Sequence, residues 1–159
     1  MKIRAWIFAV GLTSGVLLTA ILTWLALPSL MIETHESRLS VDDTIAELTR
    51  VAQETGWGVP KIYDMQGSLA AKGYADAGPM KIMSLCQPHH AHQVLAQDEN
   101  KRLASIMPCR FGVYQTSDGK VYISGMNIAL MSRMFGSAVA GPMQQAAADE
   151  KSMIKTVMR

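Results

Sequence analysis

The sequence has few charged residues and almost no excess of either sign. Charged side chains make up 18% of the 159 residues and the formal net charge is only +2, whereas an average soluble domain is about 25% charged. A protein that binds nucleic acid shows a clustered basic face and a much higher pI, so we predict no nucleic-acid binding. The low charge instead predicts that part of the chain lies outside water.

Several catalytic motifs are also absent. The chain contains no C-x-x-C, no C-x-x-C-H for haem attachment, no G-x-S-x-G and no glycine-rich phosphate loop. No carboxylate pair stands out, since the candidate acidic residues occupy expected cap or turn positions. Ordinary hydrolases and nucleotide-dependent enzymes are therefore disfavoured, and the sequence predicts no specific catalytic residue.

What the sequence does contain is a long apolar run. Residues 5–32 carry no charge and include seven Leu and three Ile, and a helix of about 20 apolar residues is enough to cross the hydrocarbon layer. We therefore predict a cytoplasmic stub at residues 1–4 and a transmembrane anchor at residues 5–32. A cleaved signal peptide is the alternative, but the run is about twice as long as a signal h-region and no A-x-A site lies near its end.

The charges beside this run predict its orientation. Lys2 and Arg4 precede it and account for the whole net charge, whereas Glu33 and Glu36 follow it. Cytoplasmic flanks are enriched in Lys and Arg. The amino terminus should therefore stay inside, with residues 33–159 on the extracytoplasmic or periplasmic side of the cytoplasmic membrane.

Residues 33–159 show no repeat and no linker, so we predict one exported domain. Apolar spacing predicts a helix over 41–55, with Ser40 as its cap and Gly56 at its end. The other expected helices are 67–74, 88–97, 127–135 with Asn127 as cap, and 139–157, and residues 98–107 are an expected connection. Strands are expected at 57–65, 80–85, 109–116 and 120–124, the last two joined by the turn Ser117-Asp118-Gly119. The fold class is α+β: a single two-layer domain with a small, mainly antiparallel sheet and packed helices.

The two cysteines, Cys86 and Cys109, are the residues best suited to chemistry. In an oxidising compartment a structural disulfide between them is the simplest interpretation, closing a loop of about 23 residues. If their strands are antiparallel neighbours, the end of one meets the start of the other and a bridge can form. If a parallel crossover joins the strands, the sulfurs lie at opposite ends of the sheet.

Cys86 also precedes an expected helix and a histidine cluster. A helix N-terminus and a nearby imidazolium both stabilise a thiolate, so Cys86 is a candidate redox thiol or soft-metal ligand. His89 and His90 are its neighbours, and the methionine-rich domain adds thioethers, most of which should fill the core. Thiolate, thioether and imidazole together suit copper or haem. The candidate metal ligands are Cys86, His89, His90, Cys109, Met107 and Met126.

Several short motifs, taken in order, resemble an uncharacterised family, the domain of unknown function 302. They are S-V-D-D-T-I-A-E-L at 40–48, Gly56-Trp57, Cys86-Gln87-Pro88, Met107-Pro108-Cys109-Arg110, D-G-K-V-Y-I-S at 118–124, and Met126-Asn127. The resemblance spans residues 37–155 and is to a branch with cysteines at these two places. It implies a compact α+β domain, pairing as a homodimer, and no established activity.

The sequence therefore leaves two hypotheses. In the first, Cys86 and Cys109, with His89 and His90, form a thiol redox or soft-metal site. Cys86 is the more reactive thiol, Cys109 its resolving or co-ligating partner, and a histidine the charge partner or a further ligand. In the second, the domain is not an enzyme: its disulfide is a staple, and its surface contacts another membrane or exported protein.

Overall fold

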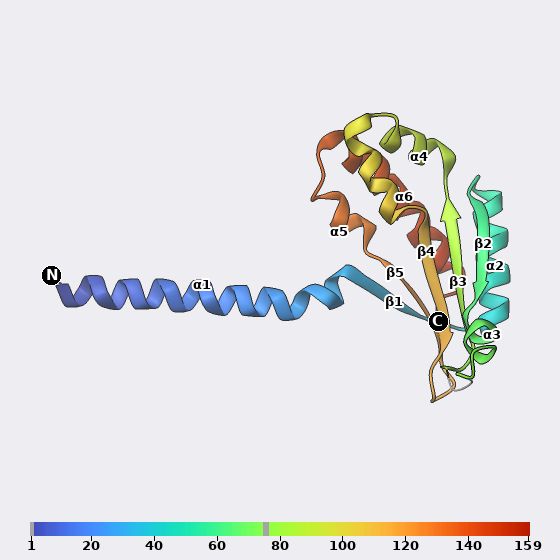
Figure 1. Cartoon of the computed structure of the whole chain (residues 1–159), viewed down its shortest axis with the longest axis horizontal. Coiled ribbons are helices and arrows are strands. Elements are labelled where there is room, and N and C mark those ends of the chain that lie inside the picture. The colour runs from blue at the N-terminus through green and yellow to red at the C-terminus, as the bar shows by residue number, and fades with distance from the viewer. Residues whose placement is uncertain (1, 75–76) are drawn as a thin grey trace. The chain divides into compact units, whose positions relative to one another are not determined.

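The computed structural model describes residues 2–74 and 77–159. They form two compact units, helix α1 (Lys2–Met31) and a domain that runs from Ile32 to Arg159 (Figure 1). The Trp6–Met31 part of α1 has 26 residues and a mean hydropathy of 1.9, so it is long and apolar enough to cross a membrane. Within the described residues, α1 is the one helix with this property.

The domain is α+β and has a five-stranded antiparallel sheet. The strands lie in the order β1-β5-β4-β3-β2, and every neighbouring pair is antiparallel. Their bounds are β1 (Ile32–Ser37), β2 (Gly58–Asp64), β3 (Met80–Cys86), β4 (Cys109–Gln115) and β5 (Val121–Met126). The predicted hairpin is β4–β5, and the turn between them contains Gly119 at φ 83°, a conformation that glycine adopts without strain.

The helices follow the predicted pattern with three corrections, the first of which is that the helix expected over 67–74 begins at Met65 and ends at Ala70. Their bounds are α2 (Val41–Glu54), α3 (Met65–Ala70), α4 (Pro88–Leu95), the 3-10 helix η2 (Asp98–Ile106), α5 (Ile128–Ser132) and α6 (Ser137–Lys155). The expected connection at 98–107 is thus helical, because its apolar Leu103 is buried and holds it against the domain. The helix expected over 127–135 is capped by Asn127 as predicted, but α5 has only five residues and ends at Ser132.

Local chemistry explains where α2 begins and ends. The Ser40 side chain accepts a hydrogen bond from the backbone N–H of Asp43 at 3.1 Å, as an N-cap does. Gly56 follows the helix with φ 78°, which lets the chain leave the helix and enter β2. The predicted cap and end are therefore confirmed.

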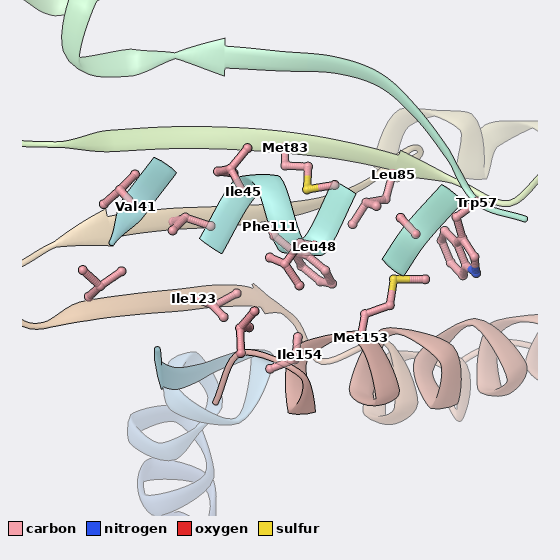
Figure 2. Close-up of a cluster of buried hydrophobic side chains, with 14 of the residues drawn as sticks. Val41, Ile45, Leu48, Trp57, Met83, Leu85, Phe111, Ile123, Met153 and Ile154 are labelled. Carbon is pink, nitrogen blue, oxygen red and sulfur yellow. The ribbon is translucent and has the colours of Figure 1, made fainter. Parts of the chain in front are cut away.

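The main core lies between one face of the sheet and helices α2 and α6. Figure 2 shows side chains from α2, from the strands and from α6 pointing toward one another. Leu48, Met83, Leu85, Val113 and Ile123 are completely buried. On β4 and β5 the buried residues Phe111, Val113, Val121 and Ile123 alternate with less buried ones, so one face of the sheet receives both helices.

A second, smaller cluster joins α4, η2 and α6. Val94, Leu103 and Val139 are its buried members, and Met107 and Met143 pack against them. Two of the methionines thus fill this cluster, and Met83 and Met153 fill the main core. Met126, Met134 and Met158 are exposed, so the predicted filling role holds for only some of the methionines. The cluster holds α4 on α6, directly beyond the end of β3.

The two edges of the sheet differ in construction. At one edge, β1 is tied to the carboxyl terminus: the Arg38 N–H donates to Val157 O at 3.0 Å, and Ser37 forms an isolated bridge with Met158. At the other edge, the pairing of β2 with β3 shifts register between Gly58 and Lys61.

Candidate functional site

Antiparallel pairing brings the two cysteines to the same end of the sheet. Cys86 is the last residue of β3 and Cys109 is the first residue of β4. The sequence left two arrangements open, and the structure shows the one in which β3 and β4 are antiparallel neighbours. This end of the sheet lies beside α4 in Figure 1. Both cysteines are free and half-buried, so the staple disulfide is not present in this structure.

The pairing register does not align the two cysteines with each other. Leu85 is the partner of Cys109, and Cys86 lies one residue farther along β3. Because successive side chains in a strand point to opposite faces, Cys109 lies on the core face, where it packs against the main core. The same alternation directs Cys86 to the other face. A disulfide between the two cysteines therefore requires the backbone at the end of β3 to move.

The Cys109 thiol interacts with a buried carboxyl group, that of Glu150 on α6. Burial raises the pKa of the Cys109 thiol well above its usual value, and the charge of Glu150 and its hydrogen bond with the thiol raise that pKa further. Glu150 itself is only 6% exposed. Burial raises the pKa of Glu150 to about 7, although the hydrogen bond from Cys109 opposes the increase. At neutral pH Cys109 is therefore a protonated thiol beside a carboxyl group that is close to half-ionised.

A second cluster of polar side chains lies around His90, in the first turn of α4. The backbone N–H of His90 donates a hydrogen bond to Gln87 Oε1 at 2.9 Å, and the Gln87 side chain thereby caps the helix. The His90 Nε2 lies 3.5 Å from Asp149 Oδ2, and the same carboxylate oxygen accepts a hydrogen bond from Trp57 Nε1 at 3.2 Å. Trp57 and His90 meet edge to face, with ring centroids 6.3 Å apart. His90 Nδ1 is buried and has no hydrogen-bond partner among the residues that the structure describes.

The other predicted ligands do not gather around the cysteines. His89 is exposed, Met126 is 42% exposed at the end of β5, and Met107 packs in the second core cluster. In the part of the chain that the structure describes, no three His, Cys, Asp or Glu side chains are grouped so that they could hold a metal ion. Copper or haem binding thus stays a prediction without a built ligand set.

Sequence reasoning missed the carboxyl groups of α6. The signal for Glu150 was present, because Val139, Met143, Ala146, Glu150 and Met153 follow the alternating four-and-three spacing of a core-facing stripe. A glutamate in such a stripe is buried wherever the helix packs on its apolar side, and a buried carboxyl has a raised pKa. No comparable signal identified Asp149, whose partners Trp57 and His90 are remote in the sequence.

Comparison with known proteins tests the resemblance proposed from the sequence. The family model described as domain of unknown function DUF302 matches residues 33–159. No curated protein matches the chain. The crystal structure of an uncharacterized conserved protein DUF302 from Bacillus stearothermophilus is similar, with a TM-score of 0.71 and 23% sequence identity, over 80% of this chain and 98% of that one. At this identity the likeness concerns the fold. The family match extends over most of the chain and confirms the predicted resemblance: the protein belongs to the DUF302 family.

Proposed function

We propose that the protein is a membrane-anchored, extracytoplasmic thiol redox module in which Cys86 and Cys109 exchange electrons with a disulfide substrate. The observation that carries this proposal is the meeting of two free cysteines at one end of neighbouring antiparallel strands. Two thiols one register position apart are close enough to become partners after a local rearrangement. They are also separate enough to remain reduced until a substrate arrives.

The proposed reaction transfers two electrons from the dithiol to the substrate. The Cys86 thiolate attacks one sulfur of a disulfide R–S–S–R, the substrate S–S bond breaks, and one R–S⁻ leaves. Cys109 then attacks the Cys86 sulfur in the mixed disulfide, and the second R–S⁻ leaves. The protein loses two thiol protons and gains one disulfide, while the substrate becomes two thiols.

The surroundings of the two cysteines favour this order of attack. The raised pKa of Cys109 leaves it without a useful thiolate population at neutral pH, so it is poorly suited to attack first. Cys86 directly precedes Gln87, the N-cap of α4, and lies at the end of its strand. The attacking thiol is therefore Cys86 and the resolving thiol is Cys109.

The end of β3 is built in a way that permits the required movement. Cys86 lies beyond the last aligned pair between β3 and β4. On its other side its partner is Gly58, which the register shift separates from the rest of the β2–β3 pairing. A change at Cys86 therefore leaves the regular part of both ladders intact.

Anchoring in the membrane rests on α1 and its flanking charges. The apolar Trp6–Met31 segment has the length of a membrane span. Lys2 and Arg4 precede it and Glu33 and Glu36 follow it, which favours an inside amino terminus. The cysteines would then face an oxidising compartment, where thiol–disulfide exchange is the prevailing chemistry of cysteine pairs.

A redox titration of the full chain in detergent micelles tests the proposal. The chain is equilibrated in buffers of reduced and oxidised glutathione, quenched in acid and examined by mass spectrometry. We expect a reversible internal bridge, which Cys86→Ser and Cys109→Ser each abolish. With Cys109→Ser we expect a lasting mixed disulfide with glutathione, and with Cys86→Ser we expect little reaction.

Three other outcomes would count against the proposal. A bridge that stays closed in all these buffers identifies a structural staple, because structural disulfides have low reduction potentials. No bridge and no mixed disulfide excludes thiol exchange. Copper or haem in protein purified without chelator, lost on Cys86→Ser, would favour the metal hypothesis instead.

A further inference from the structure

Glu150 is a buried acidic residue in the apolar stripe of α6. Its buried neighbours on the same stripe include Ala146, Met153 and Ile154, which belong to the main core. Apolar side chains solvate a carboxylate poorly, so a glutamate at such a position lowers stability unless it is paired. A purely structural reason for Glu150 is therefore missing from its surroundings.

Glu150 lacks the partners that usually compensate a buried charge. Its Oε1 atom is buried without a hydrogen-bond partner, and no ion pair involves Glu150 within residues 2–74 and 77–159. The nearby charged groups on its own helix and on β1 are Asp149 and Glu33, both acidic. Among the groups of the described residues that shift the pKa of Glu150, the thiol of Cys109 on β4 is the one that favours its charged form.

We infer that Glu150 is a catalytic residue that accepts the proton of Cys109 when this thiol attacks the mixed disulfide on Cys86. The inference rests on the proposed redox function and names the group that makes its second step feasible. The Cys109 thiol packs against the main core and is largely removed from water. The Glu150 carboxyl group interacts with this thiol and lies on the buried stripe of α6 that packs in the same core.

The atoms and electrons of this step balance. As the S–S bond between Cys109 and Cys86 forms, the Cys109 proton moves to the Glu150 carboxylate. The bond between Cys86 and the substrate sulfur breaks, and the substrate leaves as R–S⁻. Glu150 then returns its proton to solvent, and the protein retains one disulfide. The carboxylate never attacks sulfur, and it is regenerated in each cycle.

The ionisation of Glu150 suits this task. A proton acceptor works best when its pKa lies near the operating pH, and burial raises that of Glu150 to about 7. The two acidic neighbours have imidazole contacts of their own: His35 Nε2 lies 3.8 Å from Glu33 Oε2, and His90 Nε2 lies 3.5 Å from Asp149 Oδ2. Of these carboxyl groups, Glu150 is the one that interacts with Cys109.

The experiment follows the two steps separately, with oxidised glutathione as the probe and the full chain in detergent micelles. Acid quenching and mass spectrometry distinguish reduced protein, mixed disulfide and internal bridge. Because the chain has only two cysteines, each species has one assignment. The variants are Glu150→Gln, Glu150→Asp and, as matched control, Glu99→Gln, which removes an exposed carboxylate from η2.

We expect Glu150→Gln to form the mixed disulfide at the wild-type rate but to resolve it at least about 100-fold more slowly, the lower end of the usual range for a general base. In wild type the resolution rate should rise with pH around a midpoint near 7, and Glu150→Gln should lose this dependence. Glu150→Asp should retain it in part, and Glu99→Gln should behave as wild type. A Glu150 with a merely structural role would not change the pH profile.

Two results would overturn the inference, and they differ from each other. If wild type resolves the mixed disulfide and Glu150→Gln does so equally fast, the redox function stands and the role of Glu150 is wrong. If wild type never forms the internal bridge, the redox function itself fails. Tryptophan fluorescence in a Trp6→Phe, Trp24→Phe background, which leaves Trp57, shows whether each variant is folded. If Glu150→Gln misfolds, the pH profiles of wild type and Glu150→Asp decide, and the inference fails if neither profile has a midpoint near 7.

Discussion

Replacing Glu150 by Gln should stabilise the domain at neutral pH and above but not in acid. Gln has the same shape as Glu and stays neutral at every pH. Glu150 is 6% exposed, and its pKa is about 7 in the folded domain against a usual value of 4.5. The main cause is burial, which disfavours the charged form. The folded state therefore prefers the protonated acid, and the unfolded state ionises it more readily.

The sign and size of the effect follow from this difference. A folded-state pKa above the unfolded value gives a contribution to stability that is complete below pH 4.5 and is lost as the pH rises through about 7. Each unit of pKa difference corresponds to about 1.4 kcal/mol. The free energy of unfolding of wild type should thus fall by about 3 kcal/mol relative to Glu150→Gln across this range, and the difference should then remain constant.

Other titrating groups do not imitate this effect. The pKa values of Glu47 and Asp118 are lowered by hydrogen bonds from Arg50 and Thr116, so these carboxyl groups titrate below the range in question. The Cys109 thiol has a raised pKa and titrates above it. All remaining groups are common to both proteins, so a comparison at the same pH removes their contributions.

The assay is urea unfolding of the full chain in micelles, followed by tryptophan fluorescence between about pH 4 and about pH 8. Trp6→Phe and Trp24→Phe leave Trp57, which is 3% exposed in the core, as the single reporter among the three tryptophans of the chain. Glu99→Gln is the control and should follow wild type at every pH. If the free energies of unfolding of wild type and Glu150→Gln change equally with pH, Glu150 does not have a raised pKa in the folded domain and the reasoning is wrong.

Two further substitutions test the fold by the same unfolding assay. Leu48→Ala removes a completely buried side chain between α2 and the sheet, and it should cost about 2–5 kcal/mol; a loss below 1 kcal/mol would mean that α2 does not pack as described. Ser40→Ala removes the N-cap hydrogen bond to Asp43 and should cost about 1 kcal/mol, whereas an unchanged midpoint would show that the cap contributes nothing.

Much of the fold could be predicted because it depends on neighbouring residues. Ser40 and Asn127 each cap a helix that starts at the next residue. Gly119 allows a tight turn between two β-rich runs. Such signals need only a few consecutive residues, so the sequence displays them directly. The short η2 helix was missed because it is stabilised by burial of Leu103 against distant elements.

The site was harder to predict because it depends on register and on remote contacts. The sequence indicated that Cys86 and Cys109 could meet, but one residue of offset decides which face each thiol occupies. No local pattern shows that offset. In the same way His90 was grouped with His89 by position, although the structure half-buries His90 and exposes His89. Glu150 was visible as a polar residue in an apolar stripe, but its partner Cys109 was not.

The two edges of the sheet limit how copies of the protein can associate. Exposed edge strands are templates for pairing with another chain, and proteins protect them with bulges, proline and charge. The β2 edge carries Pro60 and Lys61 beside a register shift, and the β1 edge is covered at Ser37 by the bridge to Met158. These features oppose edge-to-edge pairing at β2 and at the Ser37 end of β1. If two copies pair, we therefore expect the contact to form through helices or sheet faces and not through a continuous intermolecular sheet.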